Sequence, residues 1–466
     1  MSKQRSRAAA VPIIATDWAD QEFQALIERT GQHFARIEPR LQARKYVRAC
    51  MSDLEKRNGW SISEYIGDTN PNKTQRLLSK AVWNDDEVMR EIRRYVVTNL
   101  DSAATQRSLR ILALDETGQE KKGDKTTGCQ RQYMGCAGRI SNGINTVHLS
   151  YIRPNTGHSL IGFRQWIPEE QLKDPEKTTR TQLPEDLEFA TKGQLGAQLI
   201  RETHEEGISA DFVTGDEVYG ASPDLREYCE QTEQGYVLRV ACTFPITLGA
   251  GTTLTCKQAV RHHLKTNRRW KIASAGPGSK GERLYAWAWI ATASPQHFLL
   301  IRRHIKTGEC AYHYCFVPET QTATLARLIA AAGLRWPIEE CFEFGKDYFG
   351  LDQSQVRLYQ SIKRHTTLVV AALAIFAVIA ARTRHETNTQ TPSPTSPDQK
   401  PPANPGLIPL TIREIKHLFN ATTTRPSPTW LTAHWSRWRR RHQARARWFH
   451  QRARLARNLK LAQVRP

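Results

Sequence analysis

The chain has 466 residues, of which 39% are hydrophobic, so it can bury at least one full-sized core and is not a small scaffold that depends on disulfides. Its formal net charge is +21 at pH 7. So large an excess of lysine and arginine indicates a polyanionic partner, with nucleic acid as the first candidate, because unneutralised cations repel one another.

The first 105 residues are predicted to be helical. Apolar residues recur at helical spacing in Phe23, Leu26 and Ile27, and again in the segment 88–97. The segment 58–72 fits a short three-helix DNA-binding unit, and ordinary helical packing fits it as well. We therefore expect a helical N-terminal DNA-binding domain over residues 1–105.

Residues 106–241 are predicted to form the first part of an α/β core. Strand-like runs occur at 111–114, 130–138, 145–152, 212–215 and 236–241. Helix-like runs lie between the last strands, at 193–205 and 223–231. Three strands followed by alternating helices and strands is the order of a ribonuclease H-like core, which is the fold that we expect.

The chain then leaves this core and returns to it. Residues 242–320 carry short strand signals rich in Gly, Thr and aromatic residues, which predict a β-rich insertion. Residues 321–384 are expected to be the final part of the core. In this part a helix is predicted to begin at Pro337, where the missing N–H costs nothing. The apolar run 368–381 is too short for the roughly 20 residues of a membrane span and predicts a buried helix.

The last part of the chain has an unusual composition. Residues 385–410 are rich in Pro and Thr and predict a flexible linker. Residues 411–466 form a basic tail in which Arg439, Arg440 and Arg441 stand among tryptophans. Such a tail suits a phosphate backbone, and the alternative is a solvated tail that only improves solubility.

The cysteines and the N-terminal residues indicate the cellular compartment in which the protein is expected. The nine cysteines form no Cys-x-x-Cys pair, and an odd, scattered set favours a reducing compartment. The stretch 8–15 is short and interrupted by Pro12, which is not typical of a secretory signal. We therefore expect a cytoplasmic protein that does not enter a membrane.

Three acidic residues occupy the places where a ribonuclease H-like core carries its catalytic carboxylates. Asp115 closes the first strand, Asp216 closes the fourth, and Glu339 lies on a later helix. An aspartate that closes a strand is often only a turn or cap residue, so the coincidence of all three counts more than any one. Glu116 and Glu217 would point to the other side of their strands. Converging carboxylates are what metal-dependent phosphodiester cleavage requires.

The choice of the third acid depends on helical spacing. Arg335, Glu339 and Lys346 fall on one stripe of a helix, although Pro337 places Arg335 at or just before its start. Glu340 would point elsewhere. Glu339 is therefore preferred to Glu340 and to Glu343.

Several motifs occur in a fixed order along the chain. The run 335–339, Arg-Trp-Pro-Ile-Glu, is followed by Lys346. It is similar to the Tyr-x2-Arg-x3-Glu-x6-Lys signature of transposases related to insertion sequence 4, with Ala332 in place of the tyrosine. The runs 114–118, 121–123, 131–133, 214–220, 338–342 and 350–352 resemble the subgroup of DDE transposases typified by insertion sequence 701.

This resemblance implies an enzyme that cleaves DNA and transfers strands of a bacterial insertion sequence. In such an enzyme Asp115, Asp216 and Glu339 would bind two Mg²⁺ ions, for which Mn²⁺ can substitute. Arg335 and Lys346 would contact DNA phosphates near the scissile bond. The partners would be the terminal inverted repeats and target DNA, held by a homodimer in a synaptic complex.

Further DNA contacts stay open at this point. Lys121 and Lys122 follow the first catalytic strand and are either phosphate contacts or ordinary surface lysines. Trp270 or Trp287 would stack on a flipped base or pack in the insertion. Two other functions also remain, a decayed transposase that only occupies terminal repeats and another ribonuclease H-like nuclease such as a resolvase.

Overall fold

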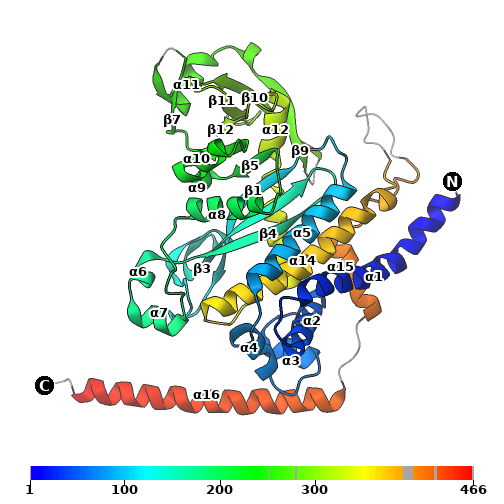
Figure 1. Ribbon diagram of the computed structural model, residues 1–466, viewed down its shortest axis with the longest axis vertical. Helices are drawn as coiled ribbons and strands as arrows, with labels where there is room; N and C mark the ends of the chain where they lie inside the picture. Colours follow the sequence, from blue (N-terminus) through cyan, green and yellow to red (C-terminus); the bar gives the residue numbers. More distant parts are fainter. Residues whose placement is uncertain (1, 250, 279–280, 392–401, 424–427, 464–466) are drawn as a thin grey trace.

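The computed structural model describes residues 2–249, 251–278, 281–391, 402–423 and 428–463. The protein is built around one large mixed sheet with helices packed against it (Figure 1). The predicted α/β class is therefore confirmed.

Five strands form the centre of this sheet, in the order β4–β3–β1–β5–β6. They are β1 (Ile111–Glu120), β3 (Arg139–Arg153), β4 (Gly157–Trp166), β5 (Phe212–Gly215) and β6 (Tyr236–Val240). β3 runs antiparallel to β1 and β4, whereas β1, β5 and β6 are parallel. This order and these directions fit the ribonuclease H-like core that the sequence predicts.

One core strand differs from the prediction. The run 130–138 yields only the short β2 (Gln130–Met134), which pairs with the start of β3. The third core strand is instead β4, in a stretch that the sequence left as a loop. A tight turn at residues 154–156 joins β3 to β4, and Asn155 there takes a positive φ of 60°.

Helices on the sheet follow the predicted positions closely. α8 (Lys192–Glu205) packs against β3 and β4, and α9 (Glu217–Gly220) and α10 (Pro223–Gln231) lie between β5 and β6 in the chain. Two short helices that the sequence did not indicate, α6 (Glu169–Leu172) and α7 (Pro175–Thr181), precede α8.

Five helices make up the N-terminal part. They are α1 (Ser2–Gly31), α2 (Ile37–Met51), α3 (Gly59–Tyr65), α4 (Asn72–Ser79) and α5 (Asp85–Ala103). Side-chain caps fix where two of them begin. Asn58 accepts hydrogen bonds from the N–H groups of Trp60 and Ser61, and Asn84 accepts one from Glu87 at 3.2 Å.

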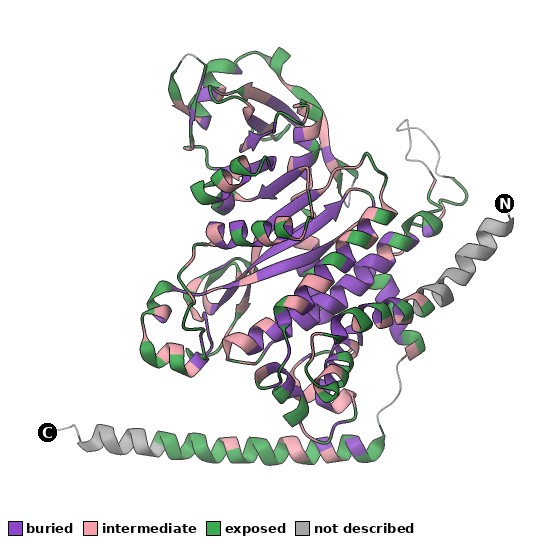
Figure 2. Ribbon diagram, viewed as in Figure 1, coloured by how far each residue is buried: buried purple, intermediate pink, exposed green. Residues whose placement is uncertain are grey.

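The long helix α14 (Tyr359–Thr387) joins these helices to the sheet. It is long and apolar enough to cross a membrane, but 89% of its most apolar stretch is buried inside the protein. In Figure 2 most of this helix has the colour of buried residues. It packs against α1, α2, α5 and β4. The prediction of a buried helix at 368–381 is therefore confirmed.

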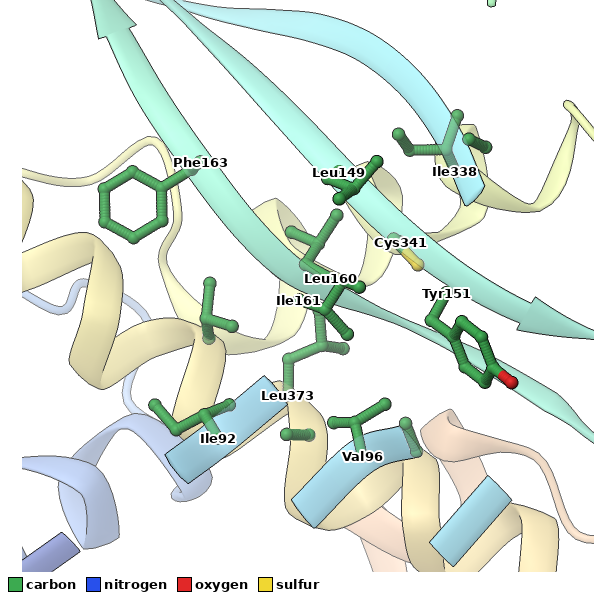
Figure 3. Packing of buried hydrophobic residues seen from close by; sticks show 14 of the residues in the cluster. Ile92, Val96, Leu149, Tyr151, Leu160, Ile161, Phe163, Ile338, Cys341 and Leu373 are labelled. Carbon is green, nitrogen blue, oxygen red and sulfur yellow. The ribbon is translucent and has the colours of Figure 1, made fainter. Parts of the chain in front are cut away.

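Figure 3 shows the packing between these helices and the sheet. Ile92 and Val96 of α5 and Leu373 of α14 meet Leu160 and Ile161 of β4, and all five are buried. Burial of an aliphatic side chain contributes about 1.5–3 kcal/mol relative to exposure. This layer therefore holds the N-terminal helices firmly against the central sheet.

Residues 242–320 do not form a separate body, because four of their strands continue the same sheet. β12 (Cys310–Phe316) pairs antiparallel with β6, and β11 (His297–Arg303), β10 (Gly281–Ala291) and β9 (Lys271–Gly278) follow outwards. A small hairpin, β7 (Pro245–Thr247) with β8 (Thr253–Thr255), and the helix α11 (Cys256–His263) cover the part nearest β12.

The chain returns from the insertion through α12 (Leu325–Gly333) and α13 (Pro337–Phe344), and a π-helical turn (Gly345–Phe349) follows α13. α12 ends in close contact with β9. A Cβ on Gly333 would lie 2.2 Å from the carbonyl oxygen of Ala275. Arg283 of β10 also links α12 to β9, because its Nη2 donates to the carbonyl oxygens of Ala275 at 2.6 Å and Gly333 at 3.1 Å.

The C-terminal part is helical. α15 (Ile412–Thr423) packs against α1 and α14, whereas only the beginning of α16 (Thr429–Gln463) contacts α3. The rest of α16 extends away from the body along the lower edge of Figure 1.

Candidate active site

Asp115 lies where two parallel strands separate. β1 and β5 are paired only over Ile111–Ala113 and Phe212–Thr214, so the residues that follow diverge. The carboxyl ends of such strands are where α/β sheets open a crevice for ligands. The Asp115 side chain is only 15% exposed, and it stands opposite the buried His148 in the β1–β3 register.

Asp216 lies at the end of β5, in the same crevice. Its Oδ1 accepts a hydrogen bond from the N–H of Val218 at 2.9 Å and so caps α9. The Asp216 side chain thus has the capping role that an aspartate after a strand commonly has. Its carboxyl also lies close enough to Asp115 to affect the pKa of that residue.

Glu339 enters the crevice from the first turn of α13. Pro337 is the first helical residue, so Arg335 stands two residues before the helix, as the sequence indicated. The helix presents Glu339 towards Arg335, whose Nη2 lies 2.5 Å from Glu339 Oε1.

Arg335 joins the first and third acids. Its Nη1 is 2.7 Å from Asp115 Oδ2 while Nη2 holds Glu339, so one guanidinium binds two carboxylates from distant parts of the chain. Burial opposes the Arg335 cation, but the charges of Asp115 and Glu339 outweigh that effect and raise the pKa of Arg335.

The electrostatics of the crevice disfavour unpaired negative charge. Burial raises the pKa of Asp115 to about 7 although Arg335 acts to lower it, and the neighbouring Asp216 adds to the rise. Burial, followed by the charge of Glu116, raises the pKa of Asp216. Arg335 alone therefore does not offset the cost of burying these charged carboxylates, and a further cation would stabilise them.

Neighbouring acids have partners of their own. Glu116 Oε1 is 2.6 Å from Lys192 Nζ, and its Oε2 accepts a hydrogen bond from the Tyr219 hydroxyl at 3.1 Å. Glu217 pairs with Arg239 at 3.1 Å. These contacts explain why Glu116 and Glu217 are poorer candidates than the aspartates that precede them.

The alternatives on α13 also face other ways. Glu340 pairs with His158 at 3.3 Å, and Glu343 is exposed. Of the three glutamates, only Glu339 contacts Arg335 in the crevice.

The donor set suits a hard divalent cation, because it consists of carboxylate oxygens. Over the part of the chain that the structure describes, however, no three His, Cys, Asp or Glu side chains are close enough to hold a metal ion. Arg335 stands between Asp115 and Glu339 instead. Metal binding at these acids would thus require Arg335 to move.

Comparison with known proteins finds two family matches and one curated relative for this chain. Residues 30–250 match the family described as DDE superfamily endonuclease, and residues 179–375 match the family described as transposase DDE domain. Over 263 residues the chain is 26% identical to a probable transposase for insertion sequence element IS701 of Microchaete diplosiphon. The chain is related to the DDE transposases.

This relationship confirms the resemblance seen in the ordered motifs. The stretch shared with the IS701 relative covers 55% of this chain and 64% of the relative, so the match spans less than two thirds of that protein. A solved structure described as a piggyBac transposase synaptic complex with hairpin DNA aligns with 91% of this chain and 84% of its own, at a TM-score of 0.43 and 8% identity.

The lysines that the resemblance to DDE transposases singled out differ in their surroundings. Lys346 is half-buried in the π-helical turn and borders a hollow with Thr117 and His148. Lys121 Nζ donates to the carbonyl oxygen of Ser354, and burial lowers the pKa of Lys121 to about 8. Lys122 is exposed. Of these three, Lys122 is the freest to meet a phosphate.

The two tryptophans of the insertion are engaged in packing. Trp287 is fully buried, and its Nε1 donates to the carbonyl oxygen of Ala273 at 3.1 Å. Trp270 is half-buried under the guanidinium of Arg303, which lies 4.0 Å from the ring centre. Trp287 has no exposed face for a base, whereas Trp270 keeps a partly open one.

The basic tail begins with a docked segment. Trp435 is fully buried, and its Nε1 donates to the carbonyl oxygen of Asp68 at 2.8 Å. Arg439 pairs with Glu64 of α3, whereas Arg440 and Arg441 are exposed. Only part of the predicted arginine cluster is therefore available to a partner.

Sequence reasoning did not find several residues that shape the site. Lys192 and Tyr219, which hold Glu116, lie on α8 and α9, and only the folded arrangement brings them to β1. Arg283, which fixes Gly333 two residues before Arg335, comes from the insertion. No local sequence pattern signals such contacts.

Proposed function

We propose that the protein is a DDE transposase that cleaves and joins the ends of an insertion sequence. The observation that carries this proposal is that Arg335 binds both Asp115 and Glu339, while the charge of Asp216 acts on Asp115. The ribonuclease H-like strand order and the relationship to DDE transposases support it.

The three acids would hold two divalent ions, Mg²⁺ or in its place Mn²⁺. When bound, such ions would make water or a 3′-hydroxyl a better nucleophile and neutralise the charge that develops on the reacting phosphate. The chain's own contribution is to hold Asp115 and Asp216 largely buried, which raises the pKa of both carboxyls, so a cation beside them would stabilise their charged forms. Arg335, once released from Asp115 and Glu339, would be close enough to contact a phosphate.

Double-stranded DNA is the proposed substrate, as terminal inverted repeats and target. The helical N-terminal part and α16 would supply the binding surface, because α16 is anchored on α3 and exposes arginines beyond the anchor. Two ends must be joined, so we propose a homodimer in a synaptic complex. These steps belong to the cytoplasm, at the bacterial nucleoid.

The test is a cleavage assay with purified protein on duplexes that carry the ends of its own genomic locus, with Mg²⁺ or Mn²⁺. Metal-dependent nicking at the element boundary, absent in Asp115→Ala, is the expected result. Tight binding of these ends without cleavage under either metal would favour a protein that only occupies terminal repeats. Nicking without strand-transfer products would favour another ribonuclease H-like nuclease.

A further inference from the structure

Arg335 occupies the centre of the acidic crevice. The two terminal nitrogens of its guanidinium reach Asp115 at 2.7 Å and Glu339 at 2.5 Å, and its side chain is 25% exposed. A guanidinium offers a planar fork that suits such a double contact, and in this crevice it supplies the positive charge that the carboxylates need. Arg335 and a metal ion therefore compete for the same oxygen atoms.

Other arginines stand near Arg335 on the face of the extended sheet. They are Arg239 of β6, Arg283 of β10 and Arg302 of β11. Burial lowers the pKa of Arg302, and the charges of Arg239, Arg283 and Arg335 lower it further, so all three lie close to Arg302. Arg302 contributes no ion pair in the described chain and lies over the ring of Tyr285, 4.6 Å from its centre. A phosphate bound beside these arginines would offer Arg335 an alternative anion.

From this geometry we propose that Arg335 is a lock on the metal site. It closes the crevice while the protein is free of DNA, and a DNA phosphate beside the neighbouring arginines draws it away. Metal binding and DNA binding then favour each other, because any coupling between two ligands acts equally in both directions. A transposase with such a lock binds its metals weakly until DNA is in place.

This inference rests on the proposed function, because it takes Asp115 and Glu339 as metal ligands. The test measures Mn²⁺ affinity by the electron paramagnetic resonance signal of free Mn²⁺, without DNA and at one pH. Arg335→Gln removes the lock. Arg335→Lys keeps a positive charge but cannot bridge both carboxylates. Both variants are expected to bind Mn²⁺ about tenfold more tightly than the wild type, within the usual range of coupling between sites.

A matched control is Arg327→Gln on α12. Arg327 pairs with Asp211 at 3.0 Å and is 34% exposed, so it is a similar ion pair outside the crevice. It should leave Mn²⁺ affinity at the wild-type value. Thermal melting of every variant shows whether the fold is retained.

Two further measurements distinguish failure of the Arg335 lock from failure of the proposed metal site. Adding duplex that carries the element ends should raise the Mn²⁺ affinity of the wild type towards that of Arg335→Gln. If the DNA-free wild type already binds Mn²⁺ as tightly as Arg335→Gln, and Asp115→Asn abolishes this binding, the lock is wrong while the metal site stands. If Asp115→Asn changes Mn²⁺ binding in no background, with or without DNA, the proposed metal site itself is wrong.

Discussion

Asp115, Asp216 and Glu339 share a crevice but depend on different supports. Asp115 relies on a buried strand, Asp216 on the helix that it caps, and Glu339 on a helix that begins only two residues earlier. Substitutions at these acids therefore differ in structural cost. Glu339 is the most exposed of the ion-paired acids around Arg335, with 36% of its side chain accessible, so it is best suited to a test of chemistry without damage to the fold.

Glu339→Gln is expected to reduce cleavage to the background seen without metal, while DNA-end binding stays nearly unchanged. The substitution removes one charged oxygen ligand but keeps the size of the side chain, and most phosphate contacts lie elsewhere. Cleavage and gel-shift assays measure the two effects. Glu343→Gln, an exposed position on the same helix, is the control and should cleave normally. An equal loss of cleavage and binding in Glu339→Gln would contradict its role as a metal ligand.

His148 makes the fold sensitive to acid. Burial, aided by Lys346, lowers the pKa of His148 from 6.5 to about 3, and its Nδ1 has no hydrogen-bond partner. Between pH 6.5 and about pH 3, His148 is protonated in the unfolded chain but stays neutral in the folded chain. Stability is therefore lost as the pH falls below 6.5, by up to about 1.4 kcal/mol per pH unit for this one group.

His148→Phe should remove this contribution, since the ring lies among Phe163 and Phe342 and loses no hydrogen bond at Nδ1. Urea unfolding at pH 7 and pH 5 should show that the free energy of unfolding falls less with pH in the variant than in the wild type. Some acid sensitivity will remain, because burial also lowers the pKa of His313 and His365. Parallel stability curves for the two proteins would rule out the role of His148.

The sequence was sufficient to propose the three acids but not their connections. Asp115 and Asp216 each follow a short apolar run, and that pattern is local, although β1 continues through Asp115 to Glu120. The contact of Arg335 with Asp115 joins residues far apart in the chain, so no spacing reveals it. The same holds for Lys121, for which the sequence left a phosphate contact and a surface position open, and which donates to the carbonyl oxygen of Ser354.

At the scale of elements, α9 illustrates how tightly the site is built. A Cβ on Gly220 would lie 1.8 Å from the backbone oxygen of Arg239 on β6, so the helix can approach the strand only without a side chain there. This helix begins at the residue after Asp216. Its position and that of the second acid are therefore coupled.

Gly220→Ala is expected to destabilise the protein by about 2–3 kcal/mol, because the clash is with backbone and the helix must shift. Urea denaturation measures the loss. Gly59→Ala is the control, since a Cβ there would meet only Gln75 Cγ at 3.8 Å. Similar stabilities for the two variants would show that α9 can move away from β6 at little cost.

Two elements were missed although the sequence carries their signals. The turn before β4 is Pro154-Asn155-Thr156-Gly157, a composition typical of tight turns. α11 is preceded by Thr255, which forms a reciprocal capping box with Gln258. In both cases the neighbouring strand signals dominated the interpretation, and only pairing in the folded sheet determines which short strands are real.

For the whole molecule, the excess of positive charge matters most where it is unpaired. Arg440, Arg441 and Arg445 are exposed on α16, beyond the docked Trp435. If each neutralises one phosphate, replacing all three by Gln should lower the slope of log affinity against log salt by up to about 2.7. Fluorescence anisotropy with duplex DNA over a range of salt measures this slope.

Three cations, one directly after α6 and two in α7, provide the control for this experiment. Lys173, Lys177 and Arg180 each pair with an acid, at 2.6, 3.4 and 3.3 Å. Their replacement by Gln should leave the salt slope nearly unchanged. A slope that responds equally to both triple variants would mean that α16 has no special part in DNA binding.

The continuous sheet also limits how this protein can evolve. Because β12 pairs with β6, and α12 meets β9 at Gly333, the insertion is joined to the core at both of its borders. Residues 242–320 therefore cannot be exchanged for the matching segment of another protein without changing the core around them. A chimaera that takes this segment from a relative would change the contacts that hold Gly333, two residues before Arg335, so the insertion and the helices that follow it must change together.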